Sequence, residues 1–316
     1  MDISVIIPSY NERESLPELI AWIDRVMQEH SFSYEILVID DGSTDGSWTE
    51  IQALSEKYPA LHGLSFRRNY GKSAALYCGF ERAKGTVVFT MDADLQDSPD
   101  EIPEMYRMIV EEDYDLVSGW KKHRKDNTFT KNLPSKLYNA TARRITGIKL
   151  HDMNCGLKAY KNEVVKSVEV YGEMHRYIPY LAKNAGFCKI AEKEVHHQKR
   201  KYGKSKFGLE RFVNGFLDLQ SLWFLSTFGK KPMHFFGYSG LAMFFIGFVI
   251  TIWIIVDKLV CQANGLKFRP VTDQPLFYLA LLAIILGVML FLAGFVGEMI
   301  ARSSSERNKY NIKSEL

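Results

Sequence analysis

The sequence predicts an α/β domain built on a mostly parallel sheet, followed by a hairpin of two membrane-spanning helices. Three observations favour this fold class. Short β-branched runs alternate with helical patterns in the N-terminal part, two long uncharged stretches lie in the C-terminal part, and polar, acid-rich segments follow three of the strand-like runs. The length of 316 residues agrees, because it suits two domains or one domain with an appendage.

Strands and helices are predicted alternately along the N-terminal part. The run from Ile3 to Pro8 is typical of a strand that is buried on both faces. Asn11, with Glu14 three residues later, resembles a capping box, which predicts that a helix begins there. Further strands are predicted at 34–39, 63–66, 86–91 and from 115 onwards, and further helices at 48–58, 73–83 and 100–111. This repeating order favours parallel strands joined by right-handed crossovers.

Polar segments follow three of the predicted strands. They span 8–12, 40–42 and 92–94 and contain most of the acids near strand ends. Ligands bind beyond the carboxyl ends of parallel strands, so we expect the three segments to converge on one edge of the sheet. A single carboxylate there could be a helix cap or a solvated turn. Three converging segments favour a binding site.

Oxygen-bearing side chains alternate at Asp92, Asp94 and Gln96. In an extended chain, alternate residues point to the same side, so these three would face one ligand. Oxygen ligands without Cys or His suit Mg²⁺ or Mn²⁺. A metal ion held there would neutralise the charge of a leaving diphosphate.

Two uncharged stretches, 235–256 and 275–296, predict membrane spans. Each has 22 residues, which is about 33 Å of helix and enough to cross a bilayer. The alternative interpretation is a pair of buried core helices. Basic residues that flank the hairpin predict that both termini and the N-terminal domain are cytoplasmic. These flanking residues are Lys230, Lys231, Arg302, Arg307, Lys309 and Lys313.

The predicted boundaries divide the chain into four parts. A cytoplasmic N-terminal domain spans 1–206, the membrane hairpin lies within 232–300, and 301–316 form a cytoplasmic tail. The stretch 207–231 is apolar with sparse polar breaks, which favours amphipathic helices at the membrane interface, with a core helix as the alternative. We expect no cleaved signal peptide, and the four scattered cysteines predict neither a disulfide scaffold nor a structural zinc site.

Charge and composition exclude some classes of function. Lys and Arg number 40 and Asp and Glu number 37, so the net charge of +3 is too balanced for nucleic-acid binding through overall charge. Basic residues concentrate at 121–144 and 199–211. One interpretation is that they attract anionic lipid headgroups, and the alternative is that some of them bind the phosphates of a nucleotide diphosphate and of a lipid phosphate. No nucleic-acid module is visible. A hydrophobic content of 47% excludes general disorder.

Several motifs resemble a known family. IIPSYNE (6–12), VIDDGSTDGS (38–47), NYGK (69–72) and MDADLQD (91–97) look like family 2 glycosyltransferases of GT-A fold. RKYGKSK (200–206) resembles a segment of the dolichol-phosphate mannose synthase branch, and the paired C-terminal spans resemble bacterial bactoprenol glucosyltransferases. No QxxRW segment occurs, so the chain does not resemble the processive polysaccharide synthases.

The resemblance implies a role for particular residues. Base and ribose of the donor would contact Pro8, Tyr10, Glu12, Ile39 and Asp41, and Lys72 would belong to the same nucleotide-sugar site. Asp92, Ala93, Asp94 and Gln96 would hold the diphosphate and its metal, and Arg200 and Lys206 would close over the donor. Lys121 stands where the family often has Arg, and Lys131 and Ser135 match an acceptor-phosphate motif with Lys in place of Arg. Asp152 falls at the position of the candidate catalytic base, and Asp94 is the second candidate catalytic residue.

The implied reaction is inverting transfer of a hexose, with UDP-glucose as the favoured donor, to undecaprenyl phosphate at a bacterial inner membrane. GDP-mannose is the alternative donor. A tethered protein that binds nucleotide sugar or lipid phosphate without turnover is a different class of function. A two-span transporter is a third possibility, but the spans contain no charge that would mark a transport path. Related bacterial enzymes suggest a homo-oligomer.

Overall fold

The computed structural model of the chain separates into two compact units. One contains residues 1–218 and 307–316, and the other contains 219–306. The structure describes residues 1–122, 143, 147–172, 174–198, 201–202, 224, 232–267, 269–303 and 312–315. The predicted interfacial segment 207–231 therefore lies almost wholly outside the described residues.

The first unit is an eight-stranded sheet in the order β7-β5-β6-β4-β1-β2-β3-β8. Its strands are β1 (Ile3–Ser9), β2 (Tyr34–Asp40), β3 (Leu61–Phe66), β4 (Val87–Thr90), β5 (Leu116–Trp120), β6 (Lys158–Lys161), β7 (Ile190–Glu194) and β8 (Ile312–Glu315). The pairs β1–β2, β1–β4, β2–β3 and β5–β7 are parallel, and β3–β8, β4–β6 and β5–β6 are antiparallel. The predicted mostly parallel α/β sheet is confirmed.

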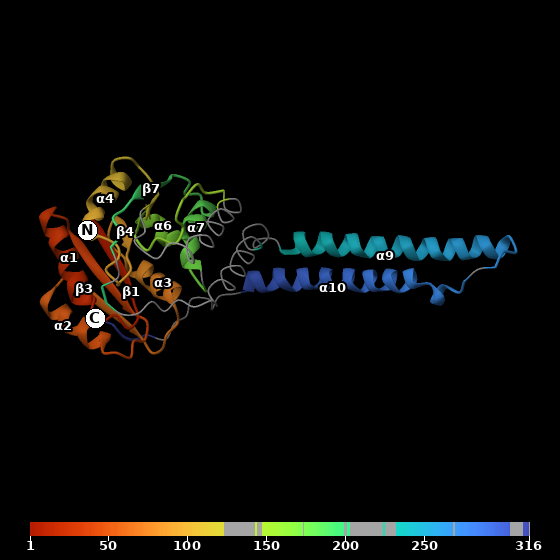
Figure 1. Cartoon of the computed structure of the whole chain (residues 1–316), viewed down its shortest axis with the longest axis horizontal. Helices are drawn as coiled ribbons and strands as arrows, with labels where there is room; N and C mark the ends of the chain where they lie inside the picture. The colour runs from red at the N-terminus through yellow and green to blue at the C-terminus, as the bar shows by residue number, and fades with distance from the viewer. Residues whose placement is uncertain are drawn as a thin grey trace. The chain divides into compact units, whose positions relative to one another are not determined.

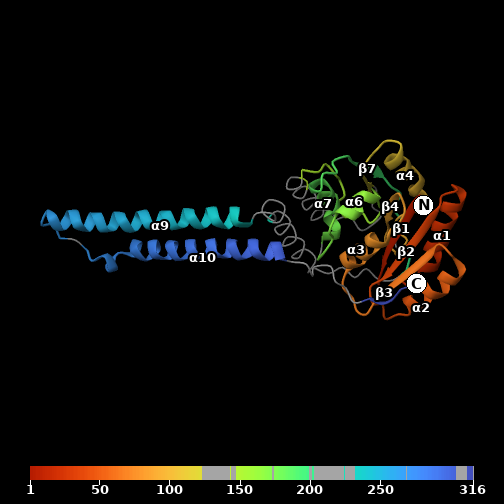
Figure 2. The same cartoon turned by 180° about the vertical axis from the view of Figure 1, so that it is seen from behind.

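Helices cover both faces of this sheet (Figures 1 and 2). One face packs against α1 (Leu16–Glu29), α2 (Ser47–Lys57) and α4 (Ile102–Val110), and the other packs against α3 (Lys72–Arg82), α6 (Asn162–Ser167) and α7 (Ile178–Asn184). Short 3₁₀ turns lie at Pro99–Glu101, Met174–Tyr177 and Val271–Asp273. The apolar stripes of the helices and the β-branched strands form two buried layers, as a sheet covered on both faces requires.

The predicted helix start at Asn11 is wrong. The helix α1 begins at Leu16, and Ser15 precedes it. Asn11 has a φ of 55°, and its side chain accepts a hydrogen bond from the Thr44 amide at 2.8 Å. Its own amide donates to the hydroxyl of Ser43 at 2.9 Å. Asn11 therefore ties the loop after β1 to the loop after β2, and this long-range contact overrides the local capping pattern.

The strands β6, β7 and β8 and the helices α6 and α7 were not predicted. The strand β6 lies between β4 and β5 and runs antiparallel to both. The strand β8 comes from the predicted tail and pairs with β3, where Arg82 Nε donates to Glu315 Oε1 at 2.7 Å. Without β8, the unpaired backbone groups of β3 would form an edge of the sheet.

The second unit contains two long apolar helices, α9 (Pro232–Ala263) and α10 (Pro275–Ser303), which lie side by side (Figure 1). Both are long and apolar enough to cross a membrane, and only 17% of the most apolar stretch of each is buried. Large apolar side chains such as Trp253 (61% exposed) and Met289 (61% exposed) point away from the hairpin. Such surface favours lipid over water, and it argues against the alternative of two core helices.

Small residues at intervals of seven let the two helices approach closely. A Cβ on Gly287 would lie 2.6 Å from the carbonyl oxygen of Gly240, and one on Gly247 would lie 2.5 Å from that of Ala280. A seven-residue spacing keeps one stripe of each helix at the contact, and the absence of side chains there permits backbone contact.

We expect the Gly287→Leu substitution to separate the hairpin. The added side chain would meet the backbone of Gly240 and Phe244, and overpacking of this kind costs about 1–3 kcal/mol. Loss of helical circular dichroism at lower denaturant concentration in detergent would report the effect. Val288→Leu, at a position 45% exposed, is the matched control and should leave the unfolding midpoint unchanged. Equal midpoints for the two variants would contradict the glycine contact.

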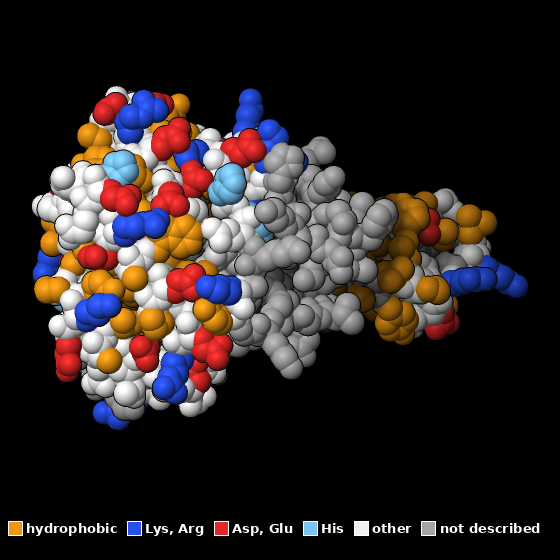
Figure 3. All heavy atoms as spheres, turned by 60° about the vertical axis from the view of Figure 1, so that its left-hand side comes forward, with side chains coloured by type: hydrophobic (Ala, Val, Ile, Leu, Met, Phe, Trp, Pro, Cys, Tyr) orange, Lys and Arg blue, Asp and Glu red, His pale blue; other side chains and the backbone are white. Residues whose placement is uncertain are grey.

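The surface of the first unit carries both signs of charge. Figure 3 shows acidic and basic side chains interspersed over the face that it draws, with hydrophobic side chains between them. No single-sign patch stands out on that face among the described residues, in keeping with the net charge of +3.

Candidate active site

The three polar segments converge at one edge of the sheet. The ends of β1 and β2 are paired, Pro8 with Ile39 and Ser9 with Asp40. The strand β4 lies on the other side of β1, and the Met91 amide donates to the Ile6 carbonyl at 3.0 Å. The segment that begins at Asp92 therefore leaves the sheet beside the loop after β1. This convergence follows from parallel pairing of β2, β1 and β4.

The loops after β1 and β2 are joined by hydrogen bonds. Besides the contacts of Asn11, the Glu12 amide donates to the Ser47 hydroxyl at 3.1 Å, and the Ser15 hydroxyl donates to a carboxylate oxygen of Glu12 at 3.2 Å. Tyr10 and Glu12 are half-buried at this edge. The side chain of Ile39 is instead packed in the core, since only 1% of the residue is exposed.

Asp41 fixes the loop that leads into α3. Its two carboxylate oxygens accept hydrogen bonds from the backbone amides of Tyr70 (2.7 Å) and Gly71 (2.9 Å). Burial raises the pKa of the Asp41 carboxyl, and the neighbouring Asp40 carboxylate adds to this effect, while the two amides act in the opposite direction. Asp41 thereby holds Lys72 at the first turn of α3, beside the acidic edge.

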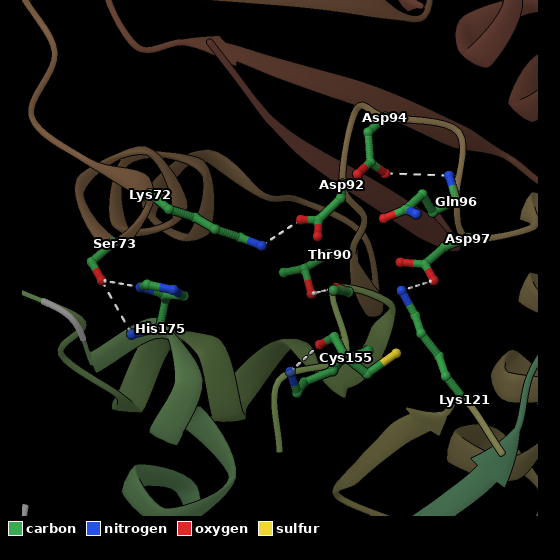
Figure 4. Close-up of polar contacts among 12 residues, drawn as sticks. Lys72, Ser73, Thr90, Asp92, Asp94, Gln96, Asp97, Lys121, Cys155 and His175 are labelled. Atoms are coloured by element: carbon green, nitrogen blue, oxygen red, sulfur yellow. Dashed lines mark hydrogen bonds and ion pairs between the residues drawn. The ribbon is translucent and has the colours of Figure 1, made fainter. Parts of the chain in front are cut away.

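Asp92, Asp94 and Gln96 lie on a turn and not on an extended chain (Figure 4). Leu95 has a φ of 59°, and the Gln96 amide donates to Asp94 Oδ1 at 3.2 Å. The predicted extended backbone is therefore wrong, because the chain bends back on itself. The predicted alternation in exposure is nevertheless present. Positions 92, 94 and 96 are half-buried, while Ala93 and Leu95 are each 4% exposed and pack in the core.

Two lysines engage the acids of this turn. Lys72 forms an ion pair with Asp92, and Lys121 forms one with Asp97 at 2.7 Å (Figure 4). Burial alone would raise the pKa of Asp92, but the ammonium of Lys72 outweighs it and lowers the pKa to about 2. Asp92 is therefore a carboxylate at neutral pH. Lys121, predicted to contact the donor, is instead held by Asp97, and its side chain is only 11% exposed.

The turn 152–156 lies against the acidic turn. Asp152 is 3% exposed, its amide donates to Glu192 Oε1 at 3.1 Å, and its Oδ1 accepts from the Asn154 amide at 3.1 Å. Gly156 lies directly against Asp92, since a Cβ on Gly156 would stand 2.5 Å from the carboxylate carbon. The structure therefore brings Asp152 and Asp92 to one site from positions 60 residues apart.

A neutral histidine lies beside Lys72. The Ser73 hydroxyl lies 3.1 Å from His175 Nδ1, and it accepts from the His175 amide at 3.1 Å (Figure 4). Burial, followed by the charge of Lys72, lowers the pKa of His175 well below its ordinary value. Asp97, Gly156 and His175 were not singled out from the sequence. Asp97 carried a signal, since it lies within the motif MDADLQD (91–97), and Gly156 lies four residues after the candidate base Asp152.

The acidic turn suits a metal that takes further ligands from a substrate. Among the described residues, no three His, Cys, Asp or Glu side chains gather into a metal site. Asp92, Asp94 and Gln96 supply two carboxylates and one amide oxygen, all half-buried on one turn. Mg²⁺ and Mn²⁺ favour oxygen ligands, and Mg²⁺ commonly completes its shell with water and substrate phosphates. The residues present fit such an ion.

Comparison with known proteins gives the family. Residues 4–168 match the family described as Glycosyl transferase family 2. The chain belongs to this family. It is 34% identical over 309 residues to the dodecaprenyl-phosphate galacturonate synthase of Rhizobium johnstonii, covering 96% of this chain and 88% of that protein. It is 35% identical over 301 residues to the undecaprenyl-phosphate 4-deoxy-4-formamido-L-arabinose transferase of Aeromonas hydrophila, covering 95% and 88%.

Solved structures share the fold of this glycosyltransferase. The glucosyl-3-phosphoglycerate synthase of Mycobacterium tuberculosis, in complex with Mn²⁺, UDP-glucose and phosphoglyceric acid, matches with a TM-score of 0.53 and 18% identity over 71% of this chain and 79% of that one. The mannosyl-3-phosphoglycerate synthase of Rubrobacter xylanophilus matches with a TM-score of 0.55 and 17% identity over 71% and 74%. The predicted fold class and family are thereby confirmed.

Four of the predicted site residues in this glycosyltransferase lie outside the described residues. They are Lys131, Ser135, Arg200 and Lys206. Adjacent to them, Lys201 and Tyr202 are described. Lys201 Nζ donates to Glu18 Oε2 at 2.6 Å, and the Tyr202 hydroxyl donates to the same oxygen at 3.2 Å. This end of the basic segment is therefore anchored to α1.

We expect the Gly156→Ala substitution to lower activity of the glycosyltransferase by about 100-fold, because misplacement of a reacting group by about 1 Å can cost that much. The new methyl group would displace the Asp92 carboxylate. Initial rates of sugar transfer at saturating donor check this. Gly237→Ala, whose added Cβ meets nothing closer than 3.4 Å, is the control. A Gly156→Ala enzyme as fast as this control would show that the turn tolerates a side chain.

Proposed function

We propose that this glycosyltransferase moves a sugar from a nucleotide diphosphate to a polyprenyl phosphate at a membrane surface. The observation that carries the proposal is the turn with Asp92, Asp94 and Gln96 at the carboxyl edge of the sheet, in a chain that also holds two membrane-length apolar helices. The names of the two bacterial relatives support a polyprenyl-phosphate acceptor.

The donor would lie across the converging loops. We assign Pro8, Tyr10, Glu12, Ile39 and Asp41 to the base and ribose, and the turn at 92–96 to the diphosphate. Mg²⁺ or Mn²⁺, when bound there, would neutralise charge on the departing diphosphate. The complex of the Mycobacterium tuberculosis enzyme with Mn²⁺ and UDP-glucose supports this assignment. Arg200 and Lys206 remain proposed donor contacts, and Lys131 and Ser135 remain proposed acceptor contacts.

The acceptor phosphate would act as the nucleophile. One of its oxygens attacks the anomeric carbon, the bond from that carbon to the diphosphate oxygen breaks, and the configuration inverts. A phosphate monoester has a second pKa near 6 and is largely dianionic at neutral pH, so it needs little deprotonation. Asp152 is buried, and its carboxylate accepts a hydrogen bond from the Asn154 amide. We therefore assign Asp152 to orientation of the acceptor more than to removal of a proton.

UDP-glucose is our first candidate donor, and GDP-mannose is the second. The relatives' names add galacturonate and 4-deoxy-4-formamido-L-arabinose to the sugars that deserve testing. We also propose that the protein is a multi-pass protein of a bacterial inner membrane, with its catalytic domain and both termini in the cytoplasm. A homo-oligomer is proposed as well, and light scattering in detergent would test it.

The deciding experiment uses the full chain in detergent with undecaprenyl phosphate. UDP-glucose, UDP-galacturonate, UDP-4-deoxy-4-formamido-L-arabinose and GDP-mannose are supplied separately with Mg²⁺ or Mn²⁺, and the lipid product is identified by mass spectrometry. We expect one donor to give polyprenyl-phosphate sugar and excess EDTA to abolish the product. Donor binding without any lipid product would instead favour a tethered binding protein. Full activity in the presence of excess EDTA would show that the reaction does not require a divalent metal ion.

A further inference from the structure

Lys158 is a buried lysine on an inner strand of the sheet. It lies on β6, paired with Thr90 of β4 on one side and Ser118 of β5 on the other, and the residue is 4% exposed. Its ammonium donates to the carbonyl oxygen of Cys155. In the described part of the chain, no carboxylate lies within ion-pair distance of Lys158.

The fold gives no reason for a charge at this position. Removal of an ammonium from water is unfavourable unless a carboxylate or several hydrogen bonds compensate it, and among the described residues Lys158 makes its hydrogen bond to one neutral carbonyl. Burial accordingly lowers the pKa of Lys158 below its ordinary value. An apolar side chain of similar length would suit the surrounding strands at least as well.

The surroundings of Lys158 belong to the proposed active site. The carboxylates of Asp92 and Asp152 favour its charged form, and its charge in turn helps to lower the pKa of Asp92. The carbonyl that Lys158 holds belongs to Cys155, which precedes Gly156, the glycine in contact with the Asp92 carboxylate. The Thr90 hydroxyl donates to the Gly156 carbonyl at 3.0 Å and fixes the other side of this turn.

We propose that Lys158 is a positioning residue of the transferase: it fixes the turn 152–156 against Asp92 and supplies a buried positive charge beneath the acidic edge. This inference rests on the proposed function. It differs from the assigned donor contacts, because Lys158 acts through Cys155 and Asp92 and does not need to touch the substrate. The residue thus serves catalysis at the expense of fold stability, a trade that active sites commonly show.

The test compares Lys158→Met with Lys158→Arg in the full chain. We expect Lys158→Met to lower kcat by about 100-fold, because the turn is no longer fixed. Its Tm should stay within about 3 °C of wild type or rise, because a buried charge has been removed. Lys158→Arg, which keeps the charge, should recover about a tenth of the wild-type kcat or more. A residue that only stabilised the fold would lose Tm and activity together.

Lys166→Met is the matched control. Lys166 also donates to backbone carbonyls, those of Phe80 (2.6 Å) and Glu81 (2.7 Å) at the end of α3, but it lies outside the proposed site. We expect its kcat to stay at the wild-type level. A kcat of Lys158→Met within threefold of wild type would overturn the inference, as would a Tm that falls in step with activity.

The failure of this inference is distinguishable from failure of the proposed function. If the wild-type protein transfers no sugar to undecaprenyl phosphate from any of the four donors, the proposed function fails, whatever the role of Lys158. Calorimetric titration with UDP and Mn²⁺ then decides the role of Lys158. Weaker binding by Lys158→Met at an unchanged Tm supports positioning of the acidic edge, and equal binding by both proteins overturns it.

Discussion

The Asp94→Ala variant is expected to lose sugar transfer by about 1,000-fold, the upper range for removal of one group that stabilises developing charge. Asp94 is half-buried on the turn at 92–96, and its Oδ1 accepts the Gln96 amide two residues away. Its loss would remove one of the two carboxylates that fit a divalent ion while leaving the core residues Ala93 and Leu95 in place. Incorporation of radiolabelled sugar into a lipid extract measures the effect.

A nearby acid provides the control for Asp94. Asp100 is exposed and accepts hydrogen bonds from Trp22 Nε1 at 2.9 Å and from Arg25 at 3.3 Å. It therefore links the 3₁₀ turn that precedes α4 to α1. Asp100→Ala should keep wild-type activity. If Asp94→Ala is as active as Asp100→Ala, the assignment of the turn to a metal and diphosphate fails, although the family and fold would stand.

The buried ion pair between Asp97 and Lys121 is expected to contribute strongly to fold stability. Asp97→Ala should destabilise the folded state by about 3–5 kcal/mol, because it leaves the Lys121 ammonium buried without a partner. The Asp97 carboxylate is fully buried and the Lys121 side chain is 11% exposed. Burial alone would lower the pKa of Lys121, but Asp97 more than offsets this and raises it. Thermal unfolding in detergent should show a fall in Tm of about 10 °C.

A double variant tests whether the loss of stability comes from the unpaired charge of Lys121. Asp97→Leu combined with Lys121→Met removes both charges, and its Tm should recover most of the loss, because apolar replacement of a buried pair is often neutral. Lys122→Met is the surface control, since its pair with Glu194 is about half exposed on both sides and is worth less than about 1 kcal/mol. If the Tm of Asp97→Ala equals that of Lys122→Met, the buried Asp97–Lys121 pair does not stabilise the fold as expected.

Lys121 shows how the structure changes the interpretation of a motif. Its place in the sequence implied a contact with the donor, but the structure pairs it with Asp97 on the turn that follows β4. The pair ties the acidic turn to the end of β5. Lys121 therefore contributes to the site by holding the turn 92–97 in place, and a direct donor contact stays a proposal.

The sequence by itself determined the local elements and the chemistry of the edge. Its strand and helix patterns encode burial within a few residues, so β1, β2, β4, α2, α3 and α4 lie close to their predicted ranges. The residues after β1, β2 and β4 converge as expected, because parallel neighbours end at the same edge. The two apolar stretches likewise form the long helices α9 and α10, since their composition alone favours lipid.

Only the tertiary structure decided which side chains compensate one another's charge. Lys72 with Asp92, Lys121 with Asp97 and Gly156 against Asp92 join positions that are 20 to 64 residues apart, and no periodicity encodes such contacts. The insertion of β6 between β4 and β5 brings Lys158 under the acidic edge. Strand order and buried charge pairing depend on long-range packing, so the partner of each acid could be found only once the chain was folded.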